Sequence, residues 1–381
     1  MNSNPVIVSS ISSISPDSWN QLANPDDLPF EPFLCHDFLM ALEASGCVGN
    51  DTGWTPAHLV MRGARKQITG IIPLYKKNHS QGEYVFDHGW ANAYEQAGGA
   101  YYPKLQGCVP FTPVTNRRLL CSDRKQASTL INALQGITTK SGISSTHVTF
   151  CTDTDAKLFR AAGWMERLGL QFHFQNPGYA SYEEFLAALS SRKRKALRSE
   201  RKRANKDMEI VNLAGDDLQT RHWDAFFKFY QDTGARKWGR PYLNREFFDL
   251  LHQTMRKNIL LILAKRDNRW IAGALHFIGG DCLYGRYWGC TQYQDSLHFE
   301  LCYHRAIEYA IAHNLPRVEA GAQGDHKIAR GYSPVLTRSF HYIVNAGLSH
   351  AVQEFLNEES KMVKHDFNAC LAASPYKDSR P

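Results

Sequence analysis

Residues 282–321 read CLYGRYWGCTQYQDSLHFELCYHRAIEYAIAHNLPRVEAG, and this stretch decides the fold that the sequence predicts. The aromatic-rich segment 282–289 has the composition of a β-strand. Residues 295–314 predict a helix, because apolar side chains from Phe299 to Ala310 recur at the spacing of one helical face. Pro316 ends this helix, and 317–321 is a short strand. We expect that strand to pair parallel to the sheet through a right-handed crossover.

The strands before this stretch repeat a pattern from near the start of the chain. Two blocks of three strands are predicted, at 58–62, 68–76 and 83–90 and at 260–264, 270–278 and 282–289. In each block a charged turn follows the first strand, a glycine lies in the second (Gly70 and Gly273), and aromatic residues end the third. We interpret this order as an internal duplication; the alternative is that two unrelated antiparallel meanders share it.

The duplication predicts two similar domains. We expect an N-terminal domain at 1–180, beginning with irregular chain and short helices, and a C-terminal domain at 208–381. A helical connector at 181–207 joins them. The expected fold class is α/β (α+β), in which each domain is a mixed, mostly antiparallel sheet flanked by helices.

Composition excludes several classes of protein. The chain has 381 residues, 43% of them hydrophobic, and its longest aliphatic run is far shorter than the roughly 20 residues that cross a bilayer. The first residues carry neither the basic nor the apolar region of a secretory signal. Nine scattered cysteines without a CxxC motif argue against a disulfide framework and for a cytoplasmic location. No Walker A or GxGxxG motif occurs.

The net charge of +7 is concentrated in the connector. Ser181 is a plausible N-cap for a helix that begins at Tyr182, and 192–206 then carry nine Lys or Arg against Glu200 alone. Three interpretations remain open: contact with a nucleic-acid backbone, contact with an anionic polymer or lipid surface, and a solvated helix. The candidate donor-binding or nucleic-acid-binding residues are Arg192, Lys193, Arg194, Lys195 and Arg198.

Several long segments resemble one known family. They include GIIPLYKKNHSQGEYVFDHGWANAYEQAG, YYPKLQGCVPFTPVTNRRLL, HFELCYHRAIEYAI and VEAGAQGDHKIARGYSPVLTRSFHYI, and they span about residues 55–350. In these segments the chain resembles the FemAB-like predicted N-acyltransferases of the GNAT superfamily, often described as peptidoglycan biosynthesis or recognition proteins. The resemblance implies tandem GNAT-like domains and acyl transfer to an amine. It also implies aminoacyl-tRNA or acyl-CoA as co-substrate, with no tightly bound cofactor. The segment TQYQDSLHFE stands where CoA-dependent GNAT enzymes have an RxxGxG/A loop, which argues against acetyl-CoA.

Three residues are candidates for the catalytic proton transfers. Glu300 lies at the edge of the apolar face of helix 295–314, where partial burial is expected to raise its pKa. Glu319 lies inside a short core strand, which is unusual for a carboxylate. His326 lies in the loop after that strand and is a candidate base or acid. For Glu300 and Glu319, helix-dipole and structural ion-pair roles respectively are the alternatives.

The predicted substrate-binding residues cluster in the same part of the sequence. Alternation sends Arg286 and Trp288 to one face of their strand. The others are His298, which flanks the start of the helix, and Gln323, Lys327, Arg330 and Tyr332 of the polar loop. No HExxH, HxxxH or GxSxG motif occurs, so we predict neither a metal site nor a serine nucleophile.

The sequence therefore predicts an N-acyltransferase whose catalytic centre lies in the second domain. The acceptor is an amine on a small metabolite, a peptide or a cell-wall precursor, and tRNA is a possible partner. The alternative is a non-catalytic GNAT-like protein that recognises peptidoglycan fragments or RNA.

Overall fold

The computed structural model describes residues 4–237, 241–322 and 324–377. The chain divides into two compact units. The first unit contains Met1–Gly169 and Leu336–His365, and the second contains Leu170–Val335 and Asp366–Pro381. Among the described helices, none combines the length and the apolar content that a bilayer crossing requires.

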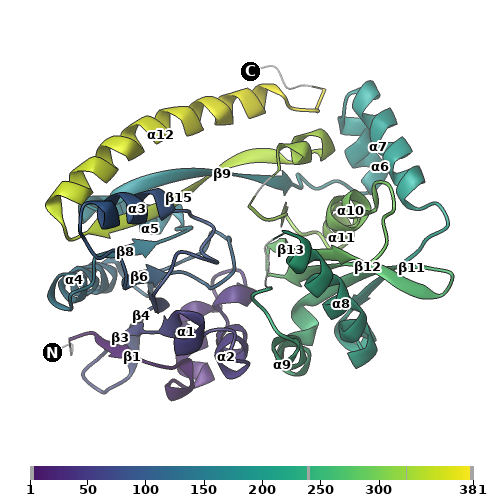
Figure 1. The fold of residues 1–381 in the computed structure, drawn as a ribbon. Coiled ribbons are helices and arrows are strands. Elements are labelled where there is room, and N and C mark those ends of the chain that lie inside the picture. The colour runs from purple at the N-terminus through teal and green to yellow at the C-terminus, as the bar shows by residue number, and fades with distance from the viewer. Residues whose placement is uncertain (1–3, 238–240, 323, 378–381) are drawn as a thin grey trace. The chain divides into compact units, whose positions relative to one another are not determined.

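The first unit has two sheets (Figure 1). Its four-stranded sheet has the order β1 (Val6–Val8), β3 (His58–Arg62), β4 (Ile68–Ile72) and β7 (Leu120–Cys121). Its second sheet has the order β2 (Trp54–Pro56), β5 (Leu74–Lys77), β6 (Lys104–Gly107), β8 (Ser145–Val148) and β15 (Ser333–Ile343). The helices that begin in this unit are α1 (Pro16–Ala23), α2 (His36–Ala44), α3 (His88–Gln96), α4 (Arg124–Lys140), α5 (Asp153–Ala161) and α12 (Ala346–Ala372).

One face of this second sheet is apolar. Leu105 of β6, Val148 of β8 and Phe340 of β15 pack in one cluster with Leu130 and Leu134 of α4. Because side chains alternate along a strand, their neighbours in sequence point to the other face. That other face carries buried polar side chains instead, namely Lys77, Lys104, Gln106, Ser145, His147 and His341.

The second unit is one mixed sheet with helices. The strand order is β10 (Glu209–Ala214), β11 (Ile259–Arg266), β12 (Arg269–Ile278), β13 (Cys282–Cys290), β14 (Arg317–Glu319) and β9 (Met165–Gln175). The helices are α6 (Tyr182–Ala188), α7 (Ser191–Ala204), α8 (Thr220–Lys237), α9 (Arg245–Met255), α10 (Leu297–Phe299) and α11 (Arg305–Ala312). A π-helical turn, Glu300–His304, joins α10 to α11.

Helix α11 covers one face of this sheet, where Ile307 packs in one cluster with Leu283 of β13 and Val318 of β14. On the other face α8 lies so close that a side chain at Gly289 would collide with the backbone of Phe229. The sheet is therefore covered on both faces, and polar side chains in it must find partners or reach solvent.

Most predicted elements of the second unit are confirmed. The three predicted strands, 260–264, 270–278 and 282–289, correspond to β11, β12 and β13. The predicted helix 295–314 corresponds to α10, the π-helical turn and α11. β14 pairs parallel to β13, as expected. Ser181 caps α6 by accepting a hydrogen bond from the amide of Glu184.

Two predictions in the first unit need correction. Residues 83–90 are not a strand: 81–87 form a loop and α3 begins at His88. The aromatic residues of that segment suggested a strand, but Tyr84 adopts a φ of 60°, which extended chain does not allow. The predicted strand 68–76 is two strands, β4 and β5, separated at Pro73.

The two units repeat one arrangement and exchange a strand each. In both, an antiparallel pair is followed by a crossover helix and a parallel strand: β5–β6, α4 and β8 in the first, and β12–β13, α10–α11 and β14 in the second. β9 crosses the boundary at Gly169 and pairs with β14 through His173–Gln175, whereas β15 returns to pair with β8. This is the tandem GNAT-like fold.

The expected division at 1–180, 181–207 and 208–381 differs from these units, since 336–365 belong to the first unit and 181–207 to the second.

Candidate functional site

The candidate site lies where β13 and β14 of the second unit part. β14 pairs with β13 only over Cys282–Tyr284, whereas β13 continues to Cys290 against β12. At Gly285 the two strands are still close, since a Cβ there would lie 3.4 Å from the carbonyl oxygen of Glu319. Beyond Glu319 the chain leaves the sheet and forms a short 3₁₀ helix, Asp325–Arg330.

Glu319 is a buried carboxylate at this point, only 4% exposed. Burial raises its pKa to about 7, although the guanidinium of Arg317 opposes the shift from 3.3 Å; Asp281 raises the pKa further and Arg286 lowers it. Among the described residues, no hydrogen-bond donor reaches the Oε2 atom of Glu319. Nε2 of His173 lies 3.9 Å from this oxygen, in a ring whose pKa burial lowers to about 3. Glu319 is thus a carboxylate with one oxygen free to accept a proton near neutral pH.

Lys327 follows β14 in the 3₁₀ helix and is also buried. Its Nζ donates a hydrogen bond to the carbonyl oxygen of Gly321 at 2.9 Å, and burial lowers its pKa to about 8. Among the described residues, no carboxylate lies within hydrogen-bond distance of this Nζ. A buried cation of this kind suits the stabilisation of negative charge that develops on a substrate.

His326 is exposed beside Lys327. Its Nε2 shares a hydrogen bond of 2.9 Å with the hydroxyl of Tyr303, and burial, followed by the charges of Arg330 and Lys327, lowers its pKa. Its ring packs on Gly324, whose φ is 113° and where a Cβ would collide with the ring. His326 is therefore neutral at pH 7, and only a glycine at 324 leaves room for it.

Of two further predicted residues, His298 lies beside His326, and Trp288 lies beside His298. The ring of His298 has its centroid 6.4 Å from that of His326 and 5.2 Å from that of Trp288. Tyr287 lies against Tyr230 of α8, whereas Trp288 packs with the cluster that contains Ile307 of α11. The predicted alternation is interrupted at Arg286, because the register of β13 against β12 shifts between Gly285 and Tyr287. Gln323 lies outside the described residues.

Glu300 does not match its expected chemistry. It is fully buried, and burial alone would raise its pKa, but hydrogen bonds and the charge of Arg201 outweigh that effect and lower it. Arg201 holds both carboxylate oxygens at 2.9 and 3.0 Å, and Arg305 adds a bond of 2.9 Å to Oε1. The predicted raised pKa was wrong because Arg201 lies 99 residues earlier, beyond what a helical wheel considers.

Arg330 and Tyr332 are held by the protein itself. Arg330 makes two bonds to Glu200, of 2.9 and 2.5 Å, and its guanidinium lies 3.4 Å from the ring centroid of Phe299. Tyr332 is 1% exposed and packs against Tyr303 and Phe174. The predicted substrate-binding role is therefore weakened for both residues.

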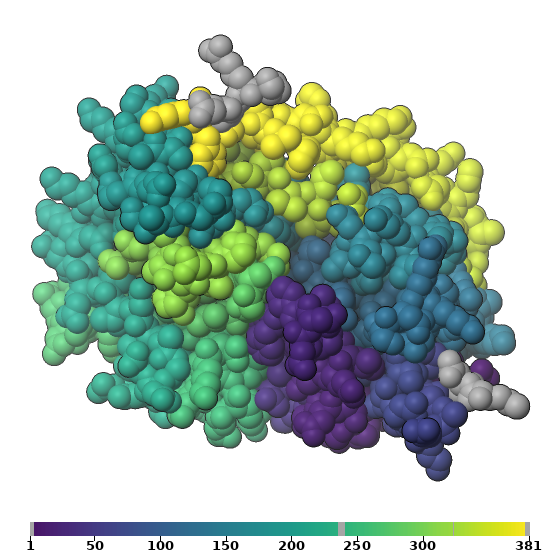
Figure 2. Space-filling view, turned by 180° about the vertical axis from the view of Figure 1, so that it is seen from behind, coloured from purple at the N-terminus to yellow at the C-terminus, as the bar shows by residue number. Residues whose placement is uncertain are grey.

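The basic helix α7 divides into two halves. Its C-terminal half is tied to the site, since Glu200 binds Arg330 and His304, and Arg201 binds Glu300. Arg198 pairs with Glu183 at 2.5 Å. Within the described part of the chain, Arg192, Lys193, Arg194 and Lys195 have no ion-pair partner. In Figure 2, α6 and α7 form the teal surface at the upper left.

Sequence reasoning missed His173, Arg317 and Tyr303. His173 lies in β9, more than 100 residues before its neighbour Glu319. The signal present in the sequence was the alternation of Gln171, His173 and Gln175 along one face of a strand. Tyr303 is four residues from Phe299 on the helix, so helical spacing places it near the predicted site.

Comparison with solved structures supports the fold. The chain resembles the crystal structure of FemX, with a TM-score of 0.56 and 13% identity over 89% of this chain and 98% of that one. It also resembles the C-terminal domain of a putative lysylphosphatidylglycerol synthetase from Agrobacterium fabrum, with a TM-score of 0.54 and 8% identity over 91% and 97% of the two chains. L-PGS from Bacillus licheniformis gives a TM-score of 0.50 and 9% identity over 87% and 97%.

Comparison with known sequences identifies the family. None of the curated protein sequences matches the chain. Residues 10–378 match the FemAB-like family, described as peptidoglycan biosynthesis/recognition. With nearly the whole chain matched, the protein belongs to the FemAB-like family.

Proposed function

We propose that the protein is an N-acyltransferase whose reaction centre lies where β13 and β14 part. The observation that carries this proposal is Glu319, a buried carboxylate with a pKa of about 7 and one oxygen that no described donor reaches. A base with a pKa near the working pH is suited to take a proton from an ammonium group. Membership of the FemAB-like family supports the reaction class.

In the proposed reaction Glu319 accepts one proton from the acceptor ammonium. The neutral amine then forms a bond to the acyl carbon of the donor, and negative charge develops on the carbonyl oxygen, where Lys327 stabilises it. The bond from the acyl carbon to the leaving oxygen or sulfur breaks, and the leaving group takes the second proton of the amine. His326, neutral at pH 7, lies in the 3₁₀ helix that follows β14 and is a second candidate proton acceptor.

The donor is an aminoacyl-tRNA or an acyl-CoA. The unpaired cations at Arg192–Lys195 favour a donor with several phosphates, because each neutralised phosphate adds to affinity. The acceptor is an amine on a small metabolite, a peptide or a cell-wall precursor, and the family description favours a peptidoglycan peptide.

Glu319→Gln tests the assignment. With the full chain, each donor class and an amine-bearing peptidoglycan peptide, we expect kcat/KM to fall about 100- to 10,000-fold, the usual contribution of a general base. In the wild type kcat/KM should rise with pH through about 7 as Glu319 ionises, and the variant should lack this limb. Glu209→Gln, an exposed carboxylate of β10, is the matched control and should keep both rate and profile.

Two outcomes would contradict the assignment. A limb below about pH 6.5, the ordinary histidine pKa, that disappears in His326→Gln but persists in Glu319→Gln would transfer the base role to His326. Binding of peptidoglycan peptides without turnover of any donor would favour a recognition protein over an enzyme.

A further inference from the structure

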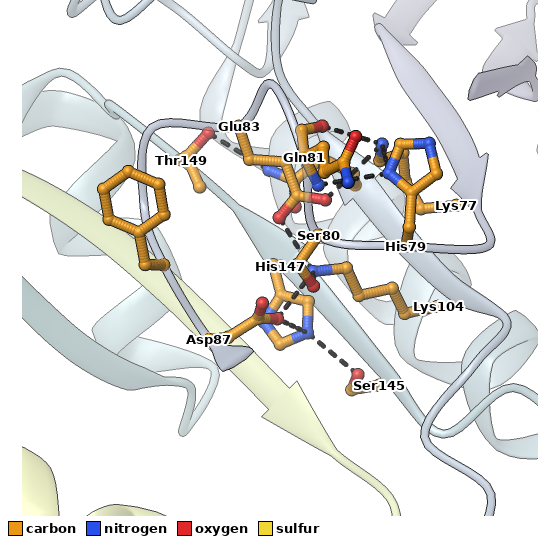
Figure 3. Close-up of polar contacts among 12 residues, drawn as sticks. Lys77, His79, Ser80, Gln81, Glu83, Asp87, Lys104, Ser145, His147 and Thr149 are labelled. Carbon is orange, nitrogen blue, oxygen red and sulfur yellow. Dashed lines mark hydrogen bonds and ion pairs between the residues drawn. The ribbon is translucent and has the colours of Figure 1, made fainter. Parts of the chain in front are cut away.

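Four titratable side chains are buried together in the first unit, two on strands of its second sheet and two in the loop formed by residues 78–87. Lys77 of β5 and Lys104 of β6 lie opposite each other in the sheet, and both side chains are fully buried. Glu83 and Asp87 reach them from the loop, as Figure 3 shows. We call Lys77, Glu83, Asp87 and Lys104 the lysine cluster. Like charges on directly opposed residues repel, so the cluster must neutralise them.

Lys104 and Asp87 form an ionised pair. The Nζ of Lys104 donates hydrogen bonds to Asp87 at 2.6 Å, to Glu83 at 2.7 Å and to Ser80 at 2.8 Å. Burial opposes the charge of Lys104, but Glu83 and Asp87 outweigh it and raise its pKa. Burial likewise opposes ionisation of Asp87, but Lys104 outweighs it and lowers the pKa of Asp87. Bonds this short are typical of charge-assisted contacts.

Lys77 is held differently, although it lies on the neighbouring strand. Its Nζ lies 3.7 Å from Oε1 of Glu83 and makes no hydrogen bond to it. It donates instead to Nδ1 of His79 at 3.2 Å and to the carbonyl oxygen of Gln81 at 3.1 Å. Two acceptors match the two N–H bonds of an uncharged amine. The ring of Trp54, 3.5 Å away, attracts the charged form, yet burial lowers the pKa of Lys77 to about 7.

Glu83, like Lys77, lacks a full set of hydrogen-bond partners for its charged form. Its Oε2 accepts from Lys104, while no described donor reaches the buried Oε1. A carboxylate would leave this oxygen unsatisfied, whereas a protonated carboxyl group carries its hydrogen there. Burial raises the pKa of Glu83 to about 7. The other titratable groups near Glu83 are Lys104 of β6, Asp87 ahead of α3, His147 of β8, and His79, Tyr101, Tyr102 and Cys108 of the connecting segments.

We propose that the closed loop 78–87 disfavours charge on both Lys77 and Glu83, and that this pair makes opening of the loop depend on pH. Opening exposes both groups to water, where a glutamate is ionised above about 4.3 and a lysine is charged below about 10.4. The closed loop disfavours these charges, and the open loop admits them.

The sign differs on the two sides of neutrality. Between the ordinary glutamate pKa and about 7, opening releases a proton from Glu83, which makes opening more favourable as pH rises. Below about 6.5 His79, whose pKa burial lowers in the closed loop, takes up a proton on opening and opposes this trend. Between about 7 and the ordinary lysine pKa, opening takes up a proton on Lys77, so it becomes less favourable as pH rises. The contributions of Glu83 and Lys77 to opening therefore peak together near pH 7.

Amide hydrogen exchange of the 78–87 peptide in the full chain measures this opening. After correction for the intrinsic exchange rate, the ratio of the wild-type opening constant to that of Glu83→Gln should rise with pH up to about 7 in a scan from about pH 5 to 9. The ratio of the wild-type constant to that of Lys77→Met should fall above about pH 7. Each ratio should change by no more than about tenfold per pH unit, the limit for one proton. Because His79 is present in all three proteins, each ratio isolates the proton of the replaced residue.

Exposed neighbours provide matched controls. Lys76→Met, on the same strand, and Glu95→Gln, on α3, should leave the pH dependence of the opening constant unchanged. A ratio to Glu83→Gln or to Lys77→Met that is flat across the scan would overturn the proposal. Should a cluster variant fail to fold, the wild-type opening constant above about pH 7.5, where His79 moves no proton, should still fall as pH rises, and a flat curve there would overturn the proposal.

Discussion

Each of the two units has a pair of polar residues at corresponding positions on neighbouring strands, but the surroundings of the two pairs differ. In the first unit His147 of β8 lies opposite His341 of the exchanged strand β15. In the second, Glu319 of β14 lies opposite His173 of the exchanged strand β9. Both pairs follow from the same topology, in which the parallel strand meets a strand from the other half of the sequence.

The difference lies in what surrounds each pair. His147 and His341 share a hydrogen bond of 2.7 Å, and the buried neighbours Ser145, Tyr101 and Asp87 surround His147. Glu319 has half-buried Arg286 nearby and a polar loop that begins one residue later. The segment that covers a polar position in a GNAT-like sheet thus decides whether that residue is part of the core or part of a candidate site.

The largest effect should come from breaking the ionised pair of the first unit. Asp87→Asn leaves Lys104 buried with its charge only partly compensated, and we expect a loss of about 3–5 kcal/mol in unfolding free energy. Urea unfolding of the full chain measures it. Asp153→Asn, an exposed carboxylate of α5, should change stability by less than about 0.5 kcal/mol. A loss as small as that of the control would mean that the ion pair of Asp87 and Lys104, on the buried polar face of the sheet, does not stabilise this unit.

A smaller loss should follow from removing the fixed carboxylate of the second unit. Glu300→Ala frees Arg201 and Arg305, which are partly exposed, so we expect a loss of about 2–3 kcal/mol. Glu308→Ala, on the same helix but more exposed, should cost less than about 1 kcal/mol. If Glu300→Gln abolished acyl transfer at unchanged stability, Glu300 would return as a catalytic residue.

The smallest effect on stability should come from the unpaired cations of α7. Replacing Arg192, Lys193, Arg194 and Lys195 together by Gln should change unfolding free energy by less than about 0.5 kcal/mol. If the donor is a nucleic acid, its affinity should fall, and the slope of log K against log salt should lessen by about 0.7–0.9 for each phosphate that is no longer neutralised. Unchanged binding and slope would leave α7 as a solvated helix.

Local pattern predicted much of the second unit. The apolar spacing from Phe299 to Ala310 and the stop at Pro316 define the crossover helix, and the parallel pairing follows from chain order. Glu319 stood out because a carboxylate inside a short core strand is unusual. The exchange of β9 and β15 was not predictable, because neither strand carries a local sign of a partner more than 100 residues away.

The misassigned loop of the first unit shows the same limit. Tyr84, Phe86 and their neighbours have the composition of a strand, but Glu83 and Asp87 turn inward to Lys104. Their lysine partner lies about twenty residues later in a different element, so composition alone favoured the wrong structure. Glu300 was predicted to be partly buried and is fully buried, and the sign of its pKa shift depended on Arg201 of α7.

The exchanged strand β15 also has a consequence for synthesis of the chain. The first unit ends at Gly169 but is completed only by Leu336–His365, so a ribosome must translate nearly the whole second unit before the first can close. Until then β8 presents an unpaired edge, a template for pairing with other nascent chains. Fragments cut at Gly169 should therefore aggregate, and the two halves of this protein must mature together.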